Sequence, residues 1–372
     1  MSKISDLIES MCPNGVRFCK IGEVAEVGTG SSNGNESDDN GKFPFFVRSQ
    51  TIKRKNTYEY DEEAIIIPGE GGIGEIFHYI NGKYALHQRV YRIHFISNLI
   101  DSRFAYYYLS AYFKAFILRK AVSATVTSIR KPMIEQFPIP LPPLPVQQEI
   151  VRILDHFTEL TAELTAELTA ELTARRKQYA YYRDALLTFG EEVEYCALEK
   201  CCLILDNQRE PVTKAMRDCG EFPYYGANGI QDYVSNYIFD GTFVLVGEDG
   251  SVVTEAGTPV VTWATGRIWV NNHAHIIQER EGVILRYLYH YLQTVNITKL
   301  VHGNIPKLTG KDFRNITIPI PPLFIQRKLV QTLDRFDALC NDLTSGLPAE
   351  IAARQKQYEY YRDKLLSFPE RS

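Results

Sequence analysis

The chain lacks the long apolar runs of membrane proteins and the cysteine patterns of secreted proteins. No apolar stretch approaches the roughly 20 residues that a membrane-spanning helix needs. The first ten residues, MSKISDLIES, show no basic and then apolar signal pattern. The 7 cysteines include no CxxC pair, which favours reduced thiols over a disulfide framework. We therefore expect a cytoplasmic protein without a membrane partner.

Motifs of known catalytic centres are also missing. The sequence contains no evident Ser-His-Asp set, no paired catalytic carboxylates and no Walker sequence. The Asn/Asp-Pro-Pro-aromatic motif of amino-methyltransferases is missing as well, because the Pro-Pro pairs lie in LPPL and IPPL. We therefore expect a chain without catalytic residues.

Two short motifs resemble ligand-binding motifs, but each is weak evidence for a bound ligand. Gly69–Gly74 fits GxGxxG after a predicted strand at 64–67, but residues 75–80 look like a strand and not the helix that a nucleotide site needs. We expect a turn there that brings the backbone close to a ligand. His273-x-His275 has no cysteine or carboxylate cluster to complete a tetrahedral metal site. Surface or groove-facing histidines, and no metal, are the expectation.

An excess of positive charge is absent too. The net charge is −4, whereas a simple nucleic-acid binder usually has a basic surface. Residues 1–139 hold 17 Lys/Arg against 15 Asp/Glu, a net of +2, and residues 190–318 hold 11 against 16, a net of −5. If the chain binds DNA, local basic patches or a partner protein must neutralise the phosphates.

What the chain does contain is a long internal repeat. Residues 140–189 align without a gap to residues 319–368, a constant shift of 179, with 27 identities in 50 positions. The block PLPPLPVQQEIVRILDHF returns as PIPPLFIQRKLVQTLDRF, and RRKQYAYYRDALLTF returns as RQKQYEYYRDKLLSF. The duplication indicates a chain built as two halves, which can bind a two-fold partner without dimerising.

Each copy of the repeat predicts helix. Residues 146–189 contain no Gly or Pro and would form one helix of roughly 65 Å at 1.5 Å per residue. Such a polar rod needs a partner helix, which the second copy can supply. In that copy Gly346 and Pro348 predict a break between two helices. The expected apolar stripe of the first helix is Leu154, Phe157, Leu160, Leu164, Leu168, Leu172, Tyr179, Tyr182 and Leu186.

A four-residue repeat lies inside the first helix. The stretch 158–174, TELTAELTAELTAELTA, carries TAEL three times in full. A plain coiled-coil spacer is the simplest interpretation. A spacer of variable repeat number would also set the distance between two globular domains, since one unit adds roughly 6 Å and about 40° of rotation.

The segments before each repeat copy resemble each other. Strands are expected at 64–67 and at 84–93, and a helix at 101–120. The stretch FPFF (43–46) matches FPYY (222–225), and AIIIPGEGG (64–72) parallels FVLVGEDG (243–250). Framework positions agree while the residues between them differ, as expected for one scaffold with two different surfaces.

Polar residues at equivalent loop positions suit the reading of bases, because Arg pairs with guanine and Asn or Gln with adenine. Basic runs suit phosphates. A solvated charged face remains the alternative for any single residue. The candidate DNA-binding residues are Arg48, Ser49, Gln50, Lys53, Arg54, Lys55, His87, Gln88, Arg89, Arg130, Lys131, Asn228, Arg267, Asn271, Asn272, His273, Lys307 and Lys311.

With these motifs the chain resembles the specificity subunit of type I restriction–modification enzymes. The resemblance rests on the paired PxPPLxxQ entries (140–147 and 319–326), the paired KQYxYYRDxLLxF exits (177–189 and 356–368) and the TAEL array. It implies an α+β fold with an internal pseudo-two-fold: two similar mixed α/β target-recognition domains joined by two long antiparallel helical regions in a coiled coil. The implied segments are 1–139, 140–189, 190–318 and 319–372.

The resemblance also implies a function. Each recognition domain would read one half of a bipartite, asymmetric site in double-stranded DNA, and the helix pair would set the gap. Two methyltransferase subunits, which carry S-adenosylmethionine, would dock on the helical regions, and restriction (motor) subunits would join through the assembled complex. No cofactor is expected in this chain. The helix residues singled out for the spacer and the partners are Leu160, Leu164, Leu168, Leu172, Tyr179, Tyr182, Tyr358 and Tyr361.

Two alternatives stay open at this point. A DNA methyltransferase acting alone would need the missing cofactor motifs, and an S-adenosylmethionine binding assay would reveal it. A scaffold that organises other proteins through its coiled coil would retain no specific DNA in any complex.

Overall fold

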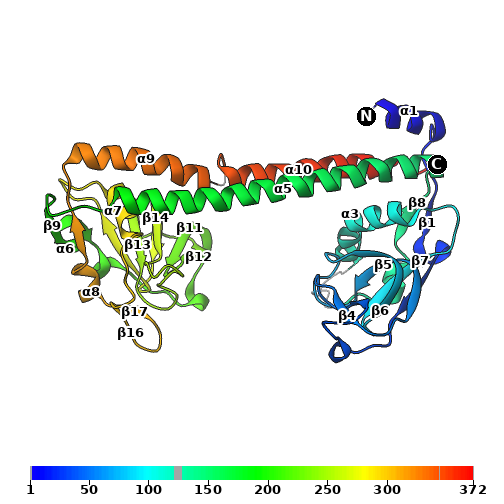
Figure 1. Ribbon diagram of the computed structural model, residues 1–372, viewed down its shortest axis with the longest axis horizontal. Helices are drawn as coiled ribbons and strands as arrows, with labels where there is room; N and C mark the ends of the chain where they lie inside the picture. The colour runs from blue at the N-terminus through cyan, green and yellow to red at the C-terminus, as the bar shows by residue number, and fades with distance from the viewer. Residues whose placement is uncertain (1, 121–127, 343, 372) are drawn as a thin grey trace. The chain divides into compact units, whose positions relative to one another are not determined.

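The computed structural model divides the chain into two compact units (Figure 1). The first unit combines Met1–Ala166 with Ala352–Ser372, and the second is Glu167–Ile351. Each unit thus contains one globular segment, part of one repeat copy and a helix from the other copy. The structure describes residues 2–120, 128–342 and 344–371.

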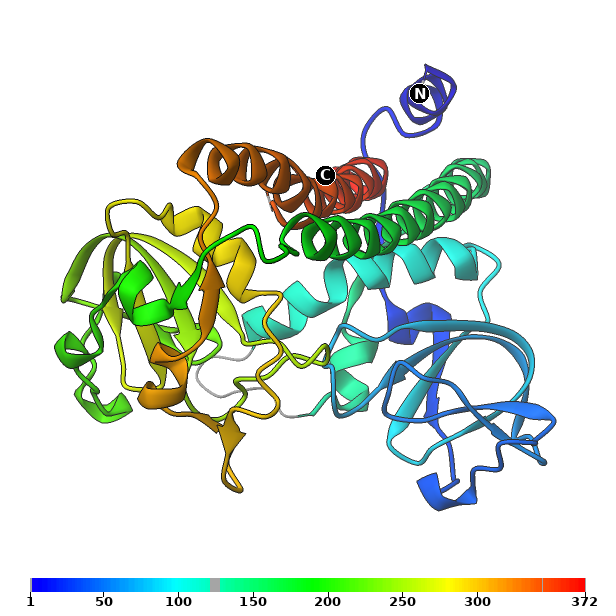
Figure 2. The same cartoon turned by 60° about the vertical axis from the view of Figure 1, so that its left-hand side comes forward.

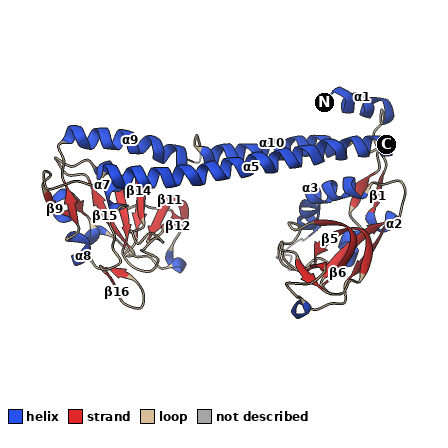
Figure 3. Ribbon diagram, in the orientation of Figure 1, coloured by secondary structure: helices blue, strands red, loops and turns tan. Residues whose placement is uncertain are grey.

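The first unit contains a six-stranded sheet in the order β2-β7-β5-β6-β3-β4 and a small two-stranded sheet, β1-β8. Strands are drawn red and helices blue in Figure 3. The elements are α1 (Ser2–Met11), β1 (Phe18–Lys20), α2 (Ile21–Val24), β2 (Ala25–Thr29), the 3-10 helix η1 (Gly34–Glu36), β3 (Phe43–Phe46), β4 (Lys53–Lys55), β5 (Tyr60–Pro68), β6 (His78–Leu86), β7 (Val90–Phe95), α3 (Ser102–Lys120), α4 (Lys131–Glu135), β8 (Pro138–Pro140), the first part of α5 (Leu144–Leu186) and most of α10 (Leu347–Leu366).

The second unit repeats this arrangement, with a sheet in the order β10-β15-β13-β14-β11-β12 and the small sheet β18-β9. Its elements are the last part of α5, β9 (Tyr195–Ala197), α6 (Leu198–Cys201), β10 (Leu203–Ile204), η2 (Asp206–Gln208), η3 (Lys214–Met216), β11 (Cys219–Gly226), β12 (Gly229–Val234), β13 (Phe239–Gly247), β14 (Val261–Val270), β15 (Ala274–Gln278), α7 (Leu285–Leu292), β16 (Val301–His302), β17 (Lys307–Leu308), α8 (Gly310–Arg314), β18 (Thr317–Pro319) and α9 (Leu323–Asn341).

The two sheets agree strand by strand, including one uncommon feature. Each mostly antiparallel sheet contains one parallel pair, β3 with β6 and β11 with β14. Phe46 lies opposite Leu86 in the first unit, and Tyr225 lies opposite Val270 in the second. These pairs confirm the match of FPFF with FPYY. The chain therefore carries the same scaffold twice.

A helix packs between each sheet and the repeat helices. In the first unit this is α3, which Figure 2 shows between the strands and α5. The carboxylate of Asp155 on α5 accepts hydrogen bonds from Arg103 Nε (3.0 Å) and from the Tyr107 hydroxyl (2.5 Å), both on α3. These bonds fix α3 against the entry part of α5.

The second unit repeats this contact with one exchange of residue type. Asp334, which is Asp155 shifted by 179, lies 2.7 Å from both Arg286 Nε and His290 Nε2 on α7. The PxPPLxxQ block is therefore followed in both copies by an aspartate that anchors the covering helix.

The glutamine that ends the PxPPLxxQ block is fully buried in both copies. Gln147 Oε1 accepts a hydrogen bond from Asp101 N–H (2.8 Å), and its Nε2 donates to the carbonyls of Leu99 (2.9 Å) and Pro142 (2.7 Å). An isolated buried amide is costly, whereas this one satisfies two backbone groups just before α3 and one in the proline connector.

Gln326 makes the same three contacts in the second unit. Its Oε1 accepts from Ile284 N–H (2.9 Å), and its Nε2 donates to the carbonyls of Gly282 (3.3 Å) and Pro321 (2.8 Å). The motif thus joins three chain segments: the proline connector, the helix after it and the covering helix.

The repeat helices pair inside each unit. The Phe157 ring on α5 lies 6.0 Å from the Tyr361 ring on α10 in the first unit. The equivalent pair in the second unit, Phe336 on α9 and Tyr182 on α5, lies 5.8 Å apart. In the first unit Thr158 meets Tyr358 next to the pair of Phe157 and Tyr361, and in the second Arg176 meets Cys340 before Tyr182 meets Phe336. Each pairing is therefore antiparallel, as expected. In Figure 1, α5 runs beside both α9 and α10.

The expected break in the second copy is confirmed, since α9 ends at Asn341 and α10 begins at Leu347. A Cβ added to Gly346 would lie 2.5 Å from the Ala338 carbonyl, so only glycine fits this close turn. The predicted helix of the first copy is also confirmed, as α5. Its stripe is only partly right, because Leu160, Tyr182 and Leu186 are 42%, 41% and 38% exposed, and Leu187 is buried in place of Leu186.

Two strand predictions need correction. The stretch 84–93 is not one strand, because β6 ends at Leu86 and β7 begins at Val90, with a tight turn between them. The predicted strand at 75–80 starts later, at His78. The helix predicted at 101–120 is confirmed as α3. Within the described residues, no helix is both long and apolar enough to cross a membrane.

We predict that Gln326→Leu lowers the free energy of unfolding of the second unit by about 2–3 kcal/mol, because buried backbone groups lose their partners. Both tryptophans, Trp263 and Trp269, belong to this unit, so their fluorescence during urea unfolding reports on it. Gln331→Leu, at an exposed position of the same helix, is the matched control and should change the transition little. Equal effects of the two variants would contradict the assigned role.

Candidate nucleic-acid interface

Four chain segments meet beside the sheet of the first unit. His87 N–H donates to the Phe46 carbonyl (3.0 Å), which joins the turn after β6 to the end of β3. Gly69 N–H donates to the Arg89 carbonyl (2.9 Å), and Ile129 N–H donates to the Gly69 carbonyl (2.7 Å). The turn after β5 and the segment before α4 therefore belong to the same group. We call residues 47–50, 69–74, 87–89 and 129–131 the first loop group.

The glycine-rich part of this group is a turn, as expected from its sequence. Gly71, Gly72 and Gly74 have φ angles of +73°, +58° and +66°, a region that residues with a Cβ rarely adopt. No helix begins there, so the geometry of a dinucleotide site is missing. The turn places Glu70 beside the residues that come after β3 and β6.

Glu70 lies between two arginines of the first loop group. Its Oε2 is 2.8 Å from Arg48 Nη1, and its two oxygens are 3.1 and 2.9 Å from Arg89 Nη1. Hydrogen bonds from Arg89 and then Arg48 lower the pKa of this carboxyl. Both arginine side chains remain about half exposed. Three charged side chains thus converge from three different loops.

The second unit builds the equivalent loop group with the same backbone bonds. Asn271 N–H donates to the Tyr225 carbonyl (3.1 Å), as His87 does to Phe46. Glu248 N–H donates to the His273 carbonyl (2.8 Å), and Leu308 N–H donates to the Glu248 carbonyl (2.8 Å). Residues 226–229, 247–250, 271–273 and 307–311 form the second loop group.

These bonds make Asp249 the counterpart of Glu70 and His273 the counterpart of Arg89. The carboxylate of Asp249 contacts His273 Nδ1. Lys307 Nζ lies 3.2 Å from Glu248 and 3.9 Å from Asp249. An acid paired with a basic residue thus occupies the same place in both units, while the basic residues differ.

A buried ionic network supports the second loop group. His275 is 1% exposed, with Nδ1 2.7 Å from Asp206 Oδ2 and Nε2 3.0 Å from the Leu308 carbonyl. Both ring nitrogens therefore lie within hydrogen-bond distance of oxygen atoms. Arg209 joins Asp206 to Glu248. The expectation of a surface-facing His275 is therefore wrong. The described residues contain no cluster of His, Cys, Asp or Glu that could hold a metal.

Most of the candidate DNA-binding residues fall into the two loop groups and are exposed, but two are buried. His87 is 7% exposed, and its Nδ1 accepts from Arg89 N–H (3.0 Å). Asn271 is 3% exposed, and its Oδ1 accepts from His273 N–H (2.8 Å). Their side chains shape the turns, so the structure corrects the expectation that they read bases directly. The exposed members are Arg48, Gln50, Gln88, Arg89, Arg130, Lys131, Asn228, Asn272, His273, Lys307 and Lys311, and Ser49 is half-buried.

The basic run in β4 lies beside the first loop group and is partly used inside the unit. Arg54 donates to the carbonyls of Gly41 (2.5 Å) and Lys42 (2.9 Å). Lys55 pairs with Glu36 at 2.6 Å. Among the described residues, Lys53 has only a long contact of 3.5 Å to the Ser37 hydroxyl, so it is the most available of the three for a phosphate.

Arg267 does not join the second loop group. Its Nε lies 3.4 Å from Asp240 in the neighbouring strand, and its guanidinium lies over the Tyr237 ring at 4.9 Å. The structure places it within β14. Its contact with DNA remains a prediction.

The helix pairs present a second type of surface. Tyr181 and Tyr360, equivalent positions of the two copies, are 70% and 62% exposed. Of the expected helix residues, Tyr179 contacts α7 and Tyr182 contacts α9 inside the second unit, where Leu172 is buried in the core. Inside the first unit, Tyr361 and Tyr358 contact α5. The exposed pair was missed by the sequence reasoning, although the repeated YY doublet could have marked it.

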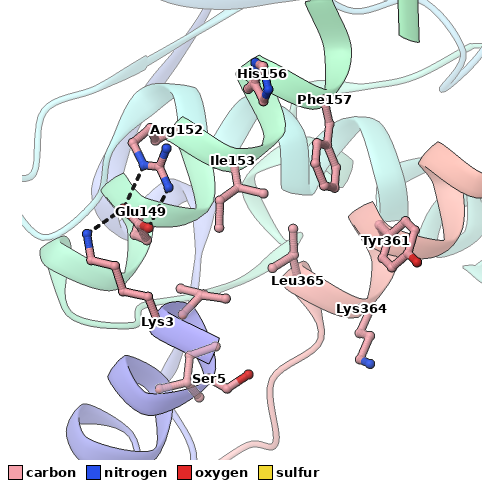
Figure 4. A pocket seen from close by; sticks show the side chains of 12 residues that line it. Lys3, Ser5, Glu149, Arg152, Ile153, His156, Phe157, Tyr361, Lys364 and Leu365 are labelled. Carbon is pink, nitrogen blue, oxygen red and sulfur yellow. Dashed lines mark hydrogen bonds and ion pairs between the residues drawn. The ribbon is translucent and has the colours of Figure 1, made fainter. Parts of the chain in front are cut away.

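In the first unit an apolar pocket of about 380 Å³ lies between α1, α5 and α10 (Figure 4). Ile153, Phe157 and Leu365 line it. Glu149 also lines the pocket. Its carboxylate lies 2.8 Å from Arg152 Nη2 and 3.8 Å from Lys3 Nζ.

The type I restriction modification DNA specificity domain matches this chain twice, at residues 13–174 and 190–353. The chain belongs to this family. The two matches contain the two sheets and their loop groups, so the internal repeat is a repeat of the family's domain.

Several proteins described as specificity subunits are similar to this chain. A putative type I restriction enzyme specificity subunit of Haemophilus influenzae is 45% identical over 186 residues, which are 49% of this chain and 48% of that protein. The EcoR124I/EcoR124II specificity subunit of Escherichia coli is 32% identical over 261 residues, 63% of this chain and 64% of that protein. The chain thus matches about half to two thirds of the length of these relatives.

Solved structures show the same fold. The type I S subunit of M. genitalium has a TM-score of 0.50 at 15% identity, with 95% of this chain and 96% of that chain covered. A chain from a structure of the type I restriction–modification system, described for complex assembly and conformational transition, has a TM-score of 0.59 at 15% identity, with 95% and 98% covered. At this identity the likeness concerns the fold alone.

The ionic support of the second specificity domain predicts a pH-dependent stability. Burial alone would raise the pKa of the Asp206 carboxyl, but the bonds from His275 and Ile276 N–H and the charge of Arg209 hold it below its usual value. A depressed pKa gives stability that is present above the unfolded value of about 4 and is lost as the pH falls through the lower folded value.

We therefore predict that Asp206→Asn costs about 3–5 kcal/mol of unfolding free energy at pH 7, as for a broken buried pair, and that this difference shrinks as the pH falls below about 4. Urea unfolding followed by tryptophan fluorescence measures both. Asp240→Asn, in the exposed pair with Arg267, should cost less than about 1 kcal/mol. A difference independent of pH would contradict the depressed pKa.

Proposed function

We propose that this chain is the DNA-specificity subunit of a type I restriction–modification complex and reads a bipartite, asymmetric site in double-stranded DNA. The observation that carries the proposal is the repeated specificity domain with two unlike loop groups. Equivalent positions hold Arg48 and Arg89 in one unit and Ala227 and His273 in the other. Unlike side chains on one scaffold would read unlike sequences.

The chain would act without catalytic residues of its own. Methylation would come from two methyltransferase subunits that carry S-adenosylmethionine, and cleavage from restriction subunits that join the assembled complex, in the bacterial cytoplasm. The pair of exposed tyrosines, Tyr181 and Tyr360, supports a docking surface on each helical pair, because exposed aromatic side chains are typical anchors of protein interfaces.

The charge distribution supports a shared DNA interface. The segment 190–318 carries a net charge of −5, and the carboxylates of Glu248 and Asp249 partly neutralise Lys307. Such a unit gains little from phosphate neutralisation. A methyltransferase partner would therefore supply much of the phosphate contact.

We predict that the isolated chain binds its DNA site weakly and that the complex with its methyltransferase partner binds it tightly. Gel-shift assays with and without the partner measure the difference, and equal affinity would overturn the proposal of shared contact. The double variant Tyr181→Ala and Tyr360→Ala should reduce at least tenfold the gain in DNA affinity that the methyltransferase partner provides. Tyr58→Ala, which removes an exposed tyrosine outside the helices, is the control.

The TAEL stretch of α5 predicts a second outcome. Removal of one unit, residues 165–168, shortens the helix by roughly 6 Å and rotates the remaining part of the helix by about 40°. The preferred gap of the DNA site should shorten, and both half-sites should remain unchanged. Sequencing of methylated sites decides this, with the equal-length variant Glu163→Gln as control. Altered half-sites would count against a spacer role.

A further inference from the structure

Each loop group contains a carboxylate at the place where a DNA-binding surface would gain from positive charge. Glu70 lies between Arg48 and Arg89 at 2.8–3.1 Å. A negative charge beside phosphates lowers affinity for any DNA sequence. The acid is therefore unfavourable for general binding, and its presence needs another explanation.

The contacts of Glu70 leave most of each guanidinium available. The carboxylate engages Nη1 of Arg48 and Nη1 of Arg89, and no other hydrogen bond of these two groups occurs in the part of the chain that the structure describes. The side chains are 46% and 57% exposed. An arginine offers five donors, so Nε and Nη2 remain for a base edge while the carboxylate restricts the rotamers. A held arginine loses less conformational entropy when it binds a guanine.

The acid recurs in the second unit although its neighbours differ. Asp249 occupies the position of Glu70, and it contacts His273 and Lys307 in place of two arginines. Glu70 and Asp249 are equivalent because the residues before them, Gly69 and Glu248, make the same two backbone hydrogen bonds. A residue that only balanced the local charge of one loop group would have no reason to recur in a unit with a net charge of −5.

We propose that Glu70 and Asp249 are specificity-determining positioning residues: each holds the basic side chains of its loop group for base reading and suppresses binding to unrelated DNA. The inference rests on the proposed function and deepens it, because it names the residue in each half that separates specific from general affinity. The two units make this testable within one molecule, since each acid should act on its own half-site alone.

The test uses the complex of the full chain with its methyltransferase partner and the variant Glu70→Gln. Discrimination against substitutions in one half-site should fall about tenfold, the effect of one well-placed base contact. Discrimination in the other half-site should stay unchanged. Affinity for unrelated duplex DNA should rise, and the slope of log K against log salt should steepen by about 0.9, as expected for one more phosphate contact. Asp249→Asn should relax the opposite half-site.

Asp61→Asn provides a control with the same loss of charge in the same unit, since Asp61 pairs with Lys83 at 4.0 Å outside the loop group. It should change neither half-site. If Glu70→Gln behaves like Asp61→Asn, or weakens both half-sites equally, the inference is overturned and the proposed function stands. If the unaltered complex shows no sequence preference, the proposed function fails, and the inference fails with it.

Discussion

The reciprocal packing of the two repeat copies is the constraint on which both units depend. Phe157 of the first copy meets Tyr361 of the second, and Phe336 of the second meets Tyr182 of the first. Neither copy can bury its apolar helix face alone, since a long, largely polar helix needs a partner. Each globular segment is therefore completed by a helix that the chain supplies from the other half. This explains why the repeat retains identical residues at these contacts.

The residues shared by the two copies also act on the covering helices. Buried Gln147 and Gln326 satisfy the same backbone groups, and Asp155 and Asp334 anchor α3 and α7. The residues that bind Asp334 include a histidine in place of the tyrosine that binds Asp155. The aspartate on the repeat helix is thus the same in both units, whereas its hydrogen-bonding residue on the covering helix differs. The loops are held by main-chain bonds, so their side chains can differ without loss of the scaffold.

The sequence predicted the duplicated scaffold, the long helix, the broken second copy and the position of the loops. These features depend on the internal repeat, on the spacing of apolar residues and on the positions of proline and glycine, all of which can be recognised in the local sequence. It did not predict that His87, Asn271 and His275 are buried. A polar side chain in a turn looks the same in the sequence whether it faces solvent or is buried, because burial depends on segments far along the chain. Asn271 contacts Gln231 and His275 contacts Leu308, which lie 40 and 33 residues away.

The acids beside the basic loop residues were missed for a related reason. Glu70 and Asp249 come after strands that the sequence comparison had already matched, yet a carboxylate is an unlikely member of a DNA surface when residues are judged one at a time. The partners of the two acids become visible only in the structure. Backbone hydrogen bonds bring Glu70 close to Arg89 and Asp249 close to His273. General affinity depends on the total charge, whereas sequence discrimination depends on where each charge is held. Under the proposed function, partner subunits supply much of the phosphate contact, and acids at the recognition loops are then compatible with the net negative charge of this chain.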